Sequence, residues 1–325
     1  MDLKWVLAAL AALVGAALFL TVKPGLEVQD TVVIAQGGAN RLALIDPASG
    51  KIETIDASAV IHGVGILQNG AKAYASSLGS DEISVIDLNQ KQVVAQVNIG
   101  GKSHHIEMSP DGRWAYITVG STNEVAVVDT RTDTLVTSIP VGEGPTYTVF
   151  SPNSKRAYVS SRKANIVSVI DTEQMLVVQE IQVESPDHLA LSPDGLTLYV
   201  ASRDADNVNV IDTDANEVTA TIAVGKGPHG IAVAKRQGRL LVFVGNRGGT
   251  TLSIIDTTTL KVIDEVDLKV SPEHITPSPD NKYLYIGSVP DESLLVFSVE
   301  KNKVLKRIDV KGEIHQIVTM DKSLP

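Results

Sequence analysis

Residues 187–224 read DHLALSPDGLTLYVASRDADNVNVIDTDANEVTATIAV, which contains four short apolar runs separated by polar turns. The first two runs flank Ser192-Pro-Asp-Gly195, whose proline and glycine are typical of a tight hairpin turn. The third run ends on Val210-Ile211-Asp212, where an aspartate can accept hydrogen bonds from backbone amides two residues further on. The stretch therefore predicts four consecutive strands joined by tight turns.

The aspartate that follows the third run recurs along almost the whole chain. Its successive spacings are 41, 42, 42, 41 and 44 residues, and a serine follows the last aspartate after 42 more. These residues are Asp46, Asp87, Asp129, Asp171, Asp212, Asp256 and Ser298. A period of about 40–45 residues is the length of one four-stranded propeller blade. The chain is therefore predicted to be an all-β, seven-bladed β-propeller, with the aspartates in turns rather than in catalysis.

The two ends of the chain complement each other within one blade. Residues 31–35 read as a second strand with no first strand before them, and residues 315–320 read as a first strand with no successors. We expect a shared blade with three strands from the N-terminus and one from the C-terminus, because this closure removes the free sheet edges. The propeller domain is predicted to occupy residues 26–325.

Three of the second strands carry a further repeated pattern. Ala157-Tyr-Val-Ser160, Leu198-Tyr-Val-Ala201 and Leu284-Tyr-Ile-Gly287 resemble the signature of YVTN-family β-propeller repeat proteins, and the resemblance extends over residues 30–320. The family is related in fold to the N-terminal domain of nitrous oxide reductase and to cytochrome d1-type propellers. The resemblance implies the fold and does not choose among these functions.

The N-terminus carries an apolar segment of a different kind. Residues 5–22 are apolar and uncharged, with Lys4 before them and Lys23 after them. We predict one hydrophobic helix, with residues 1–25 acting as a signal anchor or a signal peptide. Lys4 favours a cytoplasmic N-terminus, which places the propeller on the periplasmic or extracellular side, anchored to the membrane by this helix or secreted if the helix is cleaved.

The net charge and the absence of cysteines exclude several kinds of partner and cofactor site. The net charge is −10, and an acidic surface repels phosphate backbones, so no nucleic-acid partner is expected. The chain has no cysteines, which excludes disulfides, thiolate metal sites and covalent c-type haem attachment.

The seven histidines share two adjacent positions of the repeat, where each blade begins its first strand. The first ring position holds His62, His104, Thr146, Asp187, His229, Glu273 and His315. The second holds Gly63, His105, Tyr147, His188, Gly230, His274 and Gln316. First strands line the central channel of a propeller, so these imidazoles are predicted to gather around one axis. Neutral imidazole is a preferred ligand for copper, zinc, nickel and iron, and all seven histidines are candidate metal ligands.

One adjacent pair and five single histidines, spread over six blades, also resemble in number and placement the copper-cluster site of nitrous oxide reductase. This resemblance implies copper as the metal. The alternative is structural: a histidine after Gly-Pro, as in Gly227-Pro228-His229, can hydrogen-bond the neighbouring blade.

Arginines repeat in the loops that are expected on the same face. Arg162, Arg203 and Arg247 lie between the second and third strands of three consecutive blades, where guanidinium groups could grip carboxylates or phosphates. Together with Tyr147 they are candidate cofactor-binding residues, because d1-haem-binding propellers combine an axial histidine with tetrapyrrole carboxylates. The alternative is that these arginines are solvated loop residues.

Three functions follow. The first is an extracytoplasmic propeller that binds a transition metal or a metallo-tetrapyrrole such as d1-type haem through its hub histidines. The second is a non-enzymatic scaffold that docks a protein partner on one propeller face near the membrane. The third is a hub-metal hydrolase such as a lactonase, which would need a carboxylate-rich calcium-type site. No sequence motif assigns catalytic residues.

Overall fold

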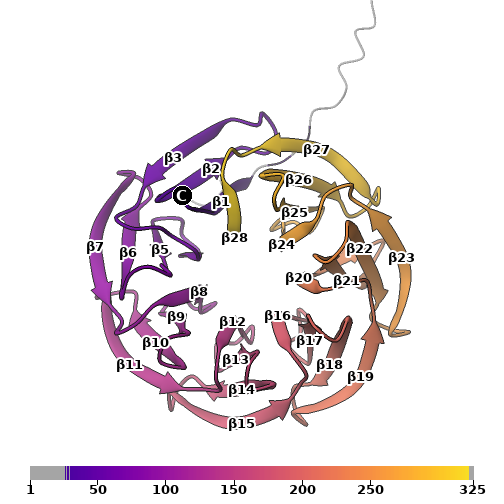
Figure 1. The fold of residues 1–325 in the computed structure, drawn as a ribbon, viewed down its shortest axis with the longest axis horizontal. Helices are drawn as coiled ribbons and strands as arrows, with labels where there is room; N and C mark the ends of the chain where they lie inside the picture. The colour runs from indigo at the N-terminus through magenta and orange to yellow at the C-terminus, as the bar shows by residue number, and fades with distance from the viewer. Residues whose placement is uncertain (1–25, 27, 29, 322–325) are drawn as a thin grey trace, which may run out of the picture.

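Seven four-stranded antiparallel sheets surround a central axis in the computed structural model, which describes residues 26, 28 and 30–321 (Figure 1). The prediction of an all-β, seven-bladed propeller is confirmed for this part of the chain. The predicted N-terminal helix lies outside the described residues. Within them, no helix has the length and apolar character that crossing a membrane requires.

The strand bounds follow the repeat from blade to blade. The first blade consists of β1 (Asp30–Gly37), β2 (Arg41–Ile45), β3 (Ile52–Asp56) and β28 (Glu313–Asp321). The second consists of β4 (Val64–Ile66), β5 (Lys72–Ala75), β6 (Glu82–Asp87) and β7 (Gln92–Asn98). The third consists of β8 (Ser103–Met108), β9 (Trp114–Val119), β10 (Glu124–Asp129) and β11 (Thr134–Pro140). The fourth consists of β12 (Pro145–Phe150), β13 (Arg156–Ser161), β14 (Ile166–Asp171) and β15 (Leu176–Gln182).

The remaining three blades continue in the same order. The fifth consists of β16 (Pro186–Leu191), β17 (Thr197–Ser202), β18 (Asn207–Asp212) and β19 (Glu217–Ala223). The sixth consists of β20 (Pro228–Arg236), β21 (Arg239–Asn246), β22 (Thr251–Asp256) and β23 (Lys261–Asp267). The seventh consists of β24 (Pro272–Pro277), β25 (Tyr283–Ser288), β26 (Ser293–Ser298) and β27 (Lys303–Asp309). The innermost strands β8, β12, β16, β20, β24 and β28 face the open centre of Figure 1.

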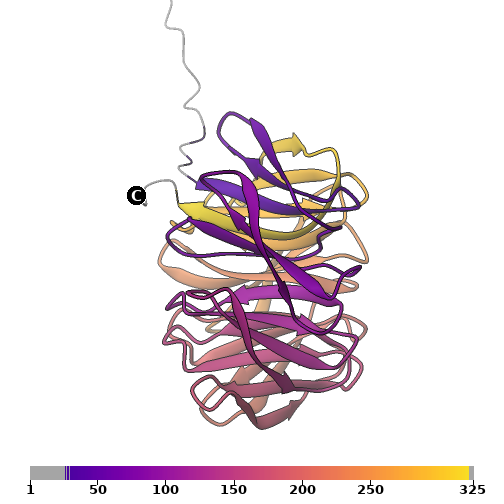
Figure 2. The ribbon, with the colours of Figure 1, turned by 90° about the vertical axis from the view of Figure 1, so that its left-hand side faces the viewer.

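The ring closes through the two ends of the chain, as the sequence predicts. The last strand, β28, pairs antiparallel with β1, with Val318 opposite Val33 and Ile317 opposite Ile34. Figure 2 shows the yellow C-terminal strand beside the indigo N-terminal strand. The first blade therefore takes three strands from the N-terminus and one from the C-terminus, and no sheet is left open at the junction.

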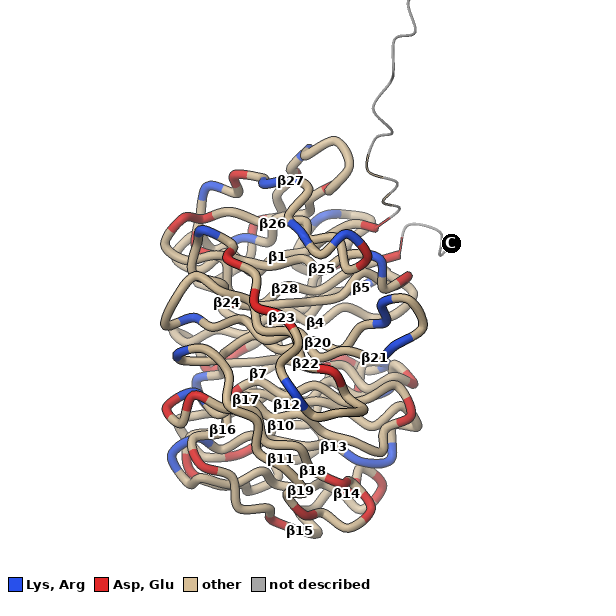
Figure 3. Tube along the Cα trace, turned by 90° about the vertical axis from the view of Figure 1, so that its right-hand side faces the viewer, with Lys and Arg blue, Asp and Glu red and all other residues tan. Residues whose placement is uncertain are grey.

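The core lies between neighbouring sheets, where branched aliphatic residues of the second and third strands interdigitate. One such layer packs Val85 and Ile83 of the second blade against Ile106 and Ile117 of the third, all fully buried. Outermost strands alternate between exposed and half-buried residues, as β7 does. Charged residues of both signs are interspersed over the side of the molecule drawn in Figure 3. Apolar packing between blades thus holds the ring.

The repeated aspartates make the predicted turns. In all six, an Oδ1 atom accepts a hydrogen bond from the backbone amide two residues on, at 2.9 or 3.0 Å. In the seventh blade, Ser298 Oγ accepts from the amide of Lys301 at 3.1 Å. These side chains are committed to the loops between third and fourth strands.

A β-bulge interrupts six of the seven innermost strands at the two ring positions. In the fifth blade the pairing with β17 shifts between Pro186 and Leu189, which leaves Asp187 and His188 out of the ladder. The same shift occurs in β8, β12, β20, β24 and β28. The ring residues of these strands were expected at the start of each strand and lie one or two residues inside it. Because a bulge re-aims side chains, two adjacent residues of one strand can both reach the hub.

Candidate metal centre

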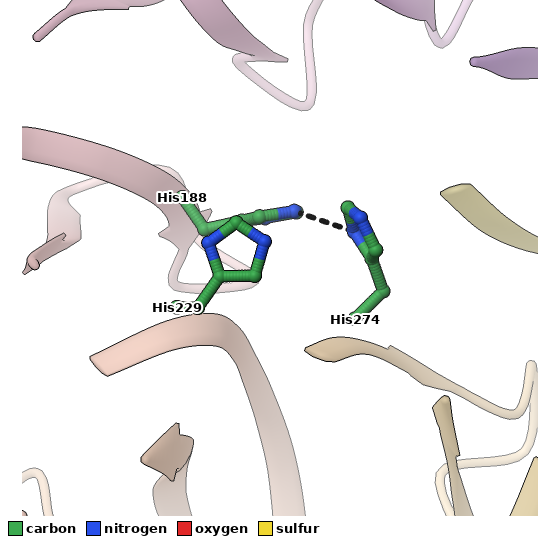
Figure 4. Close-up of side chains that lie close together, drawn as sticks. All are labelled: His188, His229 and His274. Carbon is green, nitrogen blue, oxygen red and sulfur yellow. Dashed lines mark hydrogen bonds between the residues drawn. The ribbon is translucent and has the colours of Figure 1, made fainter. Parts of the chain in front are cut away.

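Three histidines from consecutive blades converge at the hub. His188, His229 and His274 lie on β16, β20 and β24, and each offers one ligand atom within 4.8 Å of the others (Figure 4). His188 Nε2 and His274 Nδ1 are 2.9 Å apart and share a hydrogen bond. His229 and His274 are buried and His188 is partly buried. Among the described residues, this is the group of at least three donor side chains that converges closely enough to hold a metal.

His229 is flanked by two carboxylates from the neighbouring blades. Its Nδ1 lies 2.8 Å from Asp187 Oδ2, and its Nε2 lies 3.4 Å from Glu273 Oε1. Burial alone lowers the pKa of His229, but the attraction of Asp187 and Glu273 outweighs burial and raises the pKa to about 9. The imidazole is therefore protonated at neutral pH unless a metal replaces the proton on Nε2.

Two of the three predicted arginines pair with the carboxylates that flank His229. Arg203 Nη1 lies 3.7 Å from Asp187 Oδ2, and Arg247 Nε donates to Glu273. Although burial raises the pKa of Asp187, His229 and Arg203 hold it well below its usual range. The hub thus contains an alternating chain of cations and carboxylates, with His229 at its centre.

The third arginine lies apart from this chain. Arg162 Nη2 donates to both carboxylate oxygens of Asp204 at 2.8 Å, and Asp204 is an exposed loop residue of the next blade. The three arginines therefore share a position in the repeat but not a partner. Of the three, Arg203 and Arg247 contact the carboxylates beside the histidine cluster.

Tyr147 fills the centre of the hub. Its ring centroid is 3.7 Å from that of His188, and its hydroxyl is 3.3 Å from His229 Nε2. The side chain is 3% exposed, and burial raises the pKa of its hydroxyl far above the ordinary value. Tyr147 thus acts as a neutral hydrogen-bonding partner of the cluster, within contact of any ion held there.

Three other hub histidines, His62, His104 and His315, form a separate stack at the rim, whereas His105 is buried beside Tyr147 and His188. The His62 ring lies 4.3 Å from His104 and 4.2 Å from His315, centroid to centroid. His62 Nδ1 lies 3.1 Å from the carbonyl of His104, whose own Nδ1 lies 3.2 Å from the carbonyl of Thr146. Burial lowers the pKa of His62 to about 3 and that of His104 to about 4, so both are neutral. Their bonds to the adjacent blade match the structural alternative considered above.

Two cavities approach the cluster from opposite sides. On the loop face, a cavity of about 450 Å³ is lined by Arg203 and Arg247. Along the channel, a second cavity of about 310 Å³ is lined by His105, His188 and His274 together with Glu107. Burial raises the pKa of Glu107 to about 8. No sequence motif marks Glu107 as a functional residue. It lies two residues after His105 on the same strand, where alternate side chains share a face.

The donor set suits a nitrogen-coordinated metal. In the neutral form of His229, Nδ1–H donates to Asp187 and the Nε2 lone pair is available, which is the usual carboxylate–histidine–metal arrangement. Nitrogens bound at about 2.0–2.1 Å lie about 3–4 Å apart around one ion, close to the separations in the cluster. Three histidine ligands would leave a fourth position open to water or a small ligand, and the channel cavity lies beside His188 and His274.

The fold and the hub define a β-propeller with a histidine-rich centre. The chain belongs to the family described as "Lactonase, 7-bladed beta-propeller", whose model matches residues 35–222. The model described as "Cytochrome D1 heme domain" matches residues 188–279. No curated protein matches the sequence.

Solved structures with the same fold come from several proteins. Hydrazine synthase of Kuenenia stuttgartiensis is 18% identical, with a TM-score of 0.69 over 82% of this chain and 96% of that chain. The dihydro-heme d1 dehydrogenase NirN, in complex with DHE, is 20% identical, with a TM-score of 0.71 over 86% of this chain and 64% of that one. A functionally unknown protein from Desulfotomaculum acetoxidans is 15% identical, with a TM-score of 0.75 over 90% and 99%. These identities indicate a shared fold.

Proposed function

We propose that the propeller binds one transition-metal ion at its hub through His188, His229 and His274. The observation that carries this proposal is the convergence of three imidazoles from consecutive blades to within 4.8 Å. Copper is the metal we favour, because imidazole suits it and it binds nitrogen sites most strongly among the divalent first-row metals.

The surrounding residues have distinct roles in this proposal. Asp187 holds Nδ1–H of His229 and so directs Nε2 toward the cluster. Tyr147 and Glu273 border the same Nε2 atom and are available to hydrogen-bond a bound water. The channel cavity beside His188 and His274 provides the route by which a small ligand reaches the ion.

Metal titration of the full-length protein tests the proposal. Native protein is analysed for metal, stripped with chelator and titrated calorimetrically with Cu²⁺ and with Zn²⁺. We expect one tight site, which His274→Gln and His188→Gln each weaken by at least tenfold. His62→Gln, a matched change in the rim stack, leaves that affinity within about twofold. Protein that takes up neither metal would contradict the proposal and leave docking of a protein partner as the function.

Haem is the second candidate, supported by one specific observation. The residues matched by the cytochrome d1 haem model, 188–279, contain all three converging histidines and both hub arginines. A metallo-tetrapyrrole would use a histidine as axial ligand and the arginines for its carboxylates. Titration with haemin, followed by the absorption spectrum, separates this candidate from a lone metal ion, since only a bound haem gives a Soret band that shifts in His188→Gln.

Lactone hydrolysis is named in the matching family model and is the third candidate. An oxygen-coordinated cation site needs carboxylates that are free to ligate. The two carboxylates that flank the cluster, Asp187 and Glu273, are already paired with His229 and an arginine. The hub therefore supports a nitrogen-coordinated metal better than a calcium-type hydrolase site.

We also propose that the propeller works on the periplasmic or extracellular side, held by its N-terminal segment. The apolar, uncharged residues 5–22 support this location. Fusion of alkaline phosphatase to the C-terminus tests it in bacteria, because that enzyme is active only after export. An inactive fusion that accumulates in the cytoplasm would overturn the proposed location.

A further inference from the structure

The loops between second and third strands are structural repeats on the same face as the hub histidines. The amide of Arg162 donates to the carbonyl of Gly144 at 3.1 Å. The amide of Arg203 donates in the same way to Ser185 at 3.1 Å, and that of Arg247 to Gly227 at 3.0 Å. Ser185 and Gly227 are therefore equivalent positions in successive blades, and the three loops can be compared residue by residue.

Between the fourth and fifth blades, this repeat contains a complete carboxylate-binding arrangement. Arg162 Nη2 donates to both oxygens of Asp204, and Arg162 Nε donates to Ser185 Oγ at 3.3 Å. Ser185 Oγ in turn donates to Asp204 Oδ2 at 2.8 Å. One guanidinium and one hydroxyl thus hold one carboxylate across the gap between two blades.

Between the fifth and sixth blades, the arginine is kept and its partners are missing. Gly227 stands where Ser185 stands in the preceding gap, and Gly248, which follows Arg247, stands where Asp204 follows Arg203. Gly227 has a φ of +59°, and a Cβ on Gly248 would lie 2.8 Å from the carbonyl oxygen of Lys226. The close backbone approach at Gly248 selects glycine, and neither residue has a side chain to fill the space beside Arg203.

The space is a cavity lined by three cationic side chains. It has a volume of about 450 Å³ and is lined by Arg203, Lys226, Arg247, Ser271 and the two glycines. Arg203 pairs with Asp187 at 3.7 Å, and Arg247 donates to Glu273 through its Nε. Lys226 is exposed and has no ion pair within the described part of the chain.

The two acidic residues at the edge of the cavity are already engaged. Asp204 is bound to Arg162, and Asp206 Oδ1 accepts from the amide of Gly227 at 2.7 Å. Three basic and two acidic side chains line the cavity, which leaves a formal excess of one positive charge.

We propose that this cavity is a binding site for a small organic carboxylate. The ligand's carboxylate would lie across Arg203 as Asp204 lies across Arg162, and a second carboxylate of the same molecule would reach Lys226 and Arg247. The volume is that of a small-molecule site. The site does not depend on a metal at the hub, since none of its lining residues belongs to the histidine cluster.

Calorimetric titration of the metal-free, full-length protein with citrate, succinate and inorganic phosphate tests the proposal. We expect citrate to bind most tightly, because it presents three carboxylates. Arg203→Gln and Lys226→Gln should each weaken citrate binding by about tenfold or more. Lys163→Gln is the control and should change it less than twofold, because Lys163 is an exposed loop lysine outside the cavity lining that pairs with Glu143. Lys226→Gln keeps the test valid if Arg203→Gln does not fold, because Lys226 is an exposed loop residue and its backbone hydrogen bond with Gly248 is kept in the variant.

Three outcomes overturn the proposal: no carboxylate binds, only phosphate binds, or Lys163→Gln weakens binding as much as Arg203→Gln. The proposed metal function is tested separately with His274→Gln, which should weaken metal binding by at least tenfold and leave citrate binding unchanged. A protein that binds metal but no carboxylate would therefore contradict the carboxylate site alone.

Discussion

Asp187 Oδ2 accepts a 2.8 Å hydrogen bond from His229 Nδ1, which joins the innermost strands of two neighbouring blades. Both residues occupy the first ring position, at bulges that turn their side chains toward the hub. The pair links Arg203 on one side to Glu273 on the other. The charge chain is therefore a contact between three blades, and its loss should affect both the ring and the metal centre.

Asp187→Asn should destabilise the protein by about 3–5 kcal/mol, because it leaves His229 and Arg203 without their buried counter-charge. The pKa of His229 should fall at the same time. Urea denaturation measures the first effect, and NMR titration of the imidazole measures the second. Asp204→Asn is the control: it removes an exposed partner of Arg162 and should cost no more than about 1 kcal/mol. Equal losses in the two variants would refute the buried charge chain.

Acid should destabilise the ring through its neutral histidines. Burial lowers the pKa of six histidines, for example to about 3 in His62 and His188 and to about 4 in His104. The unfolded chain titrates near 6.5, so it binds these protons first and stability falls as the pH drops from about 6.5 toward 4. Each such histidine contributes up to about 1.4 kcal/mol per pH unit in this window.

Urea midpoints measured between pH 5 and pH 8 test this dependence. The double variant His62→Gln, His104→Gln should show a shallower decline below pH 6.5 than the unmodified protein. A midpoint that stays constant between pH 7 and pH 5 would show that the hub imidazoles are not buried in the neutral form.

Metal affinity should rise with pH because of His229. Its pKa of about 9 means that a metal must displace a proton from Nε2 at neutral pH. The apparent association constant should therefore increase by up to about tenfold per pH unit from pH 7 to pH 9 and then level off. Calorimetric titration of Cu²⁺ in buffers of different ionisation enthalpy measures the released proton. In Asp187→Asn the rise should end at a lower pH, and an unchanged profile in that variant would count against the pairing.

Truncation before Glu313 should prevent formation of the ring. It removes β28, the partner of β1, together with its Ile317, and exposes Ile34 of the buried first-blade core. We expect loss of the cooperative thermal transition measured by circular dichroism. Ile317→Asp should act in the same direction, whereas Val178→Thr on the outer strand β15, where Val178 is 47% exposed, should change the midpoint by less than about 2 °C. A truncated chain with a native thermal transition would show that the pairing of β28 with β1 is not required for the ring to form.

Most of the architecture was predictable from local sequence. The spacing from Asp46 to Ser298 predicts seven blades because each blade is a complete hairpin series with its own turns. The unmatched strands at the two ends predict the shared first blade. The same alignment places every histidine at two ring positions, because corresponding residues of a rotational repeat lie at corresponding depths.

The grouping of those histidines depended on the tertiary structure. Bulges in β16, β20 and β24 bring His188, His229 and His274 together, while backbone carbonyls of the next blade hold His62 and His104 at the rim. Whether a histidine joins the cluster or the rim stack depends on its contacts with the neighbouring blade. The residues that make those contacts lie about 42 positions away in the sequence.

For the arginines, too, the sequence determined one part of the arrangement and the tertiary structure the other. Sequence alone determined that Arg162, Arg203 and Arg247 occupy equivalent loops on one face. Only the folded ring decided that Arg162 binds Asp204, while Arg203 faces a cavity beside Gly227 and Gly248. The physical reason is that a side chain's partners are set by contacts across the gap between blades, whereas the repeat determines only where along each blade that side chain begins.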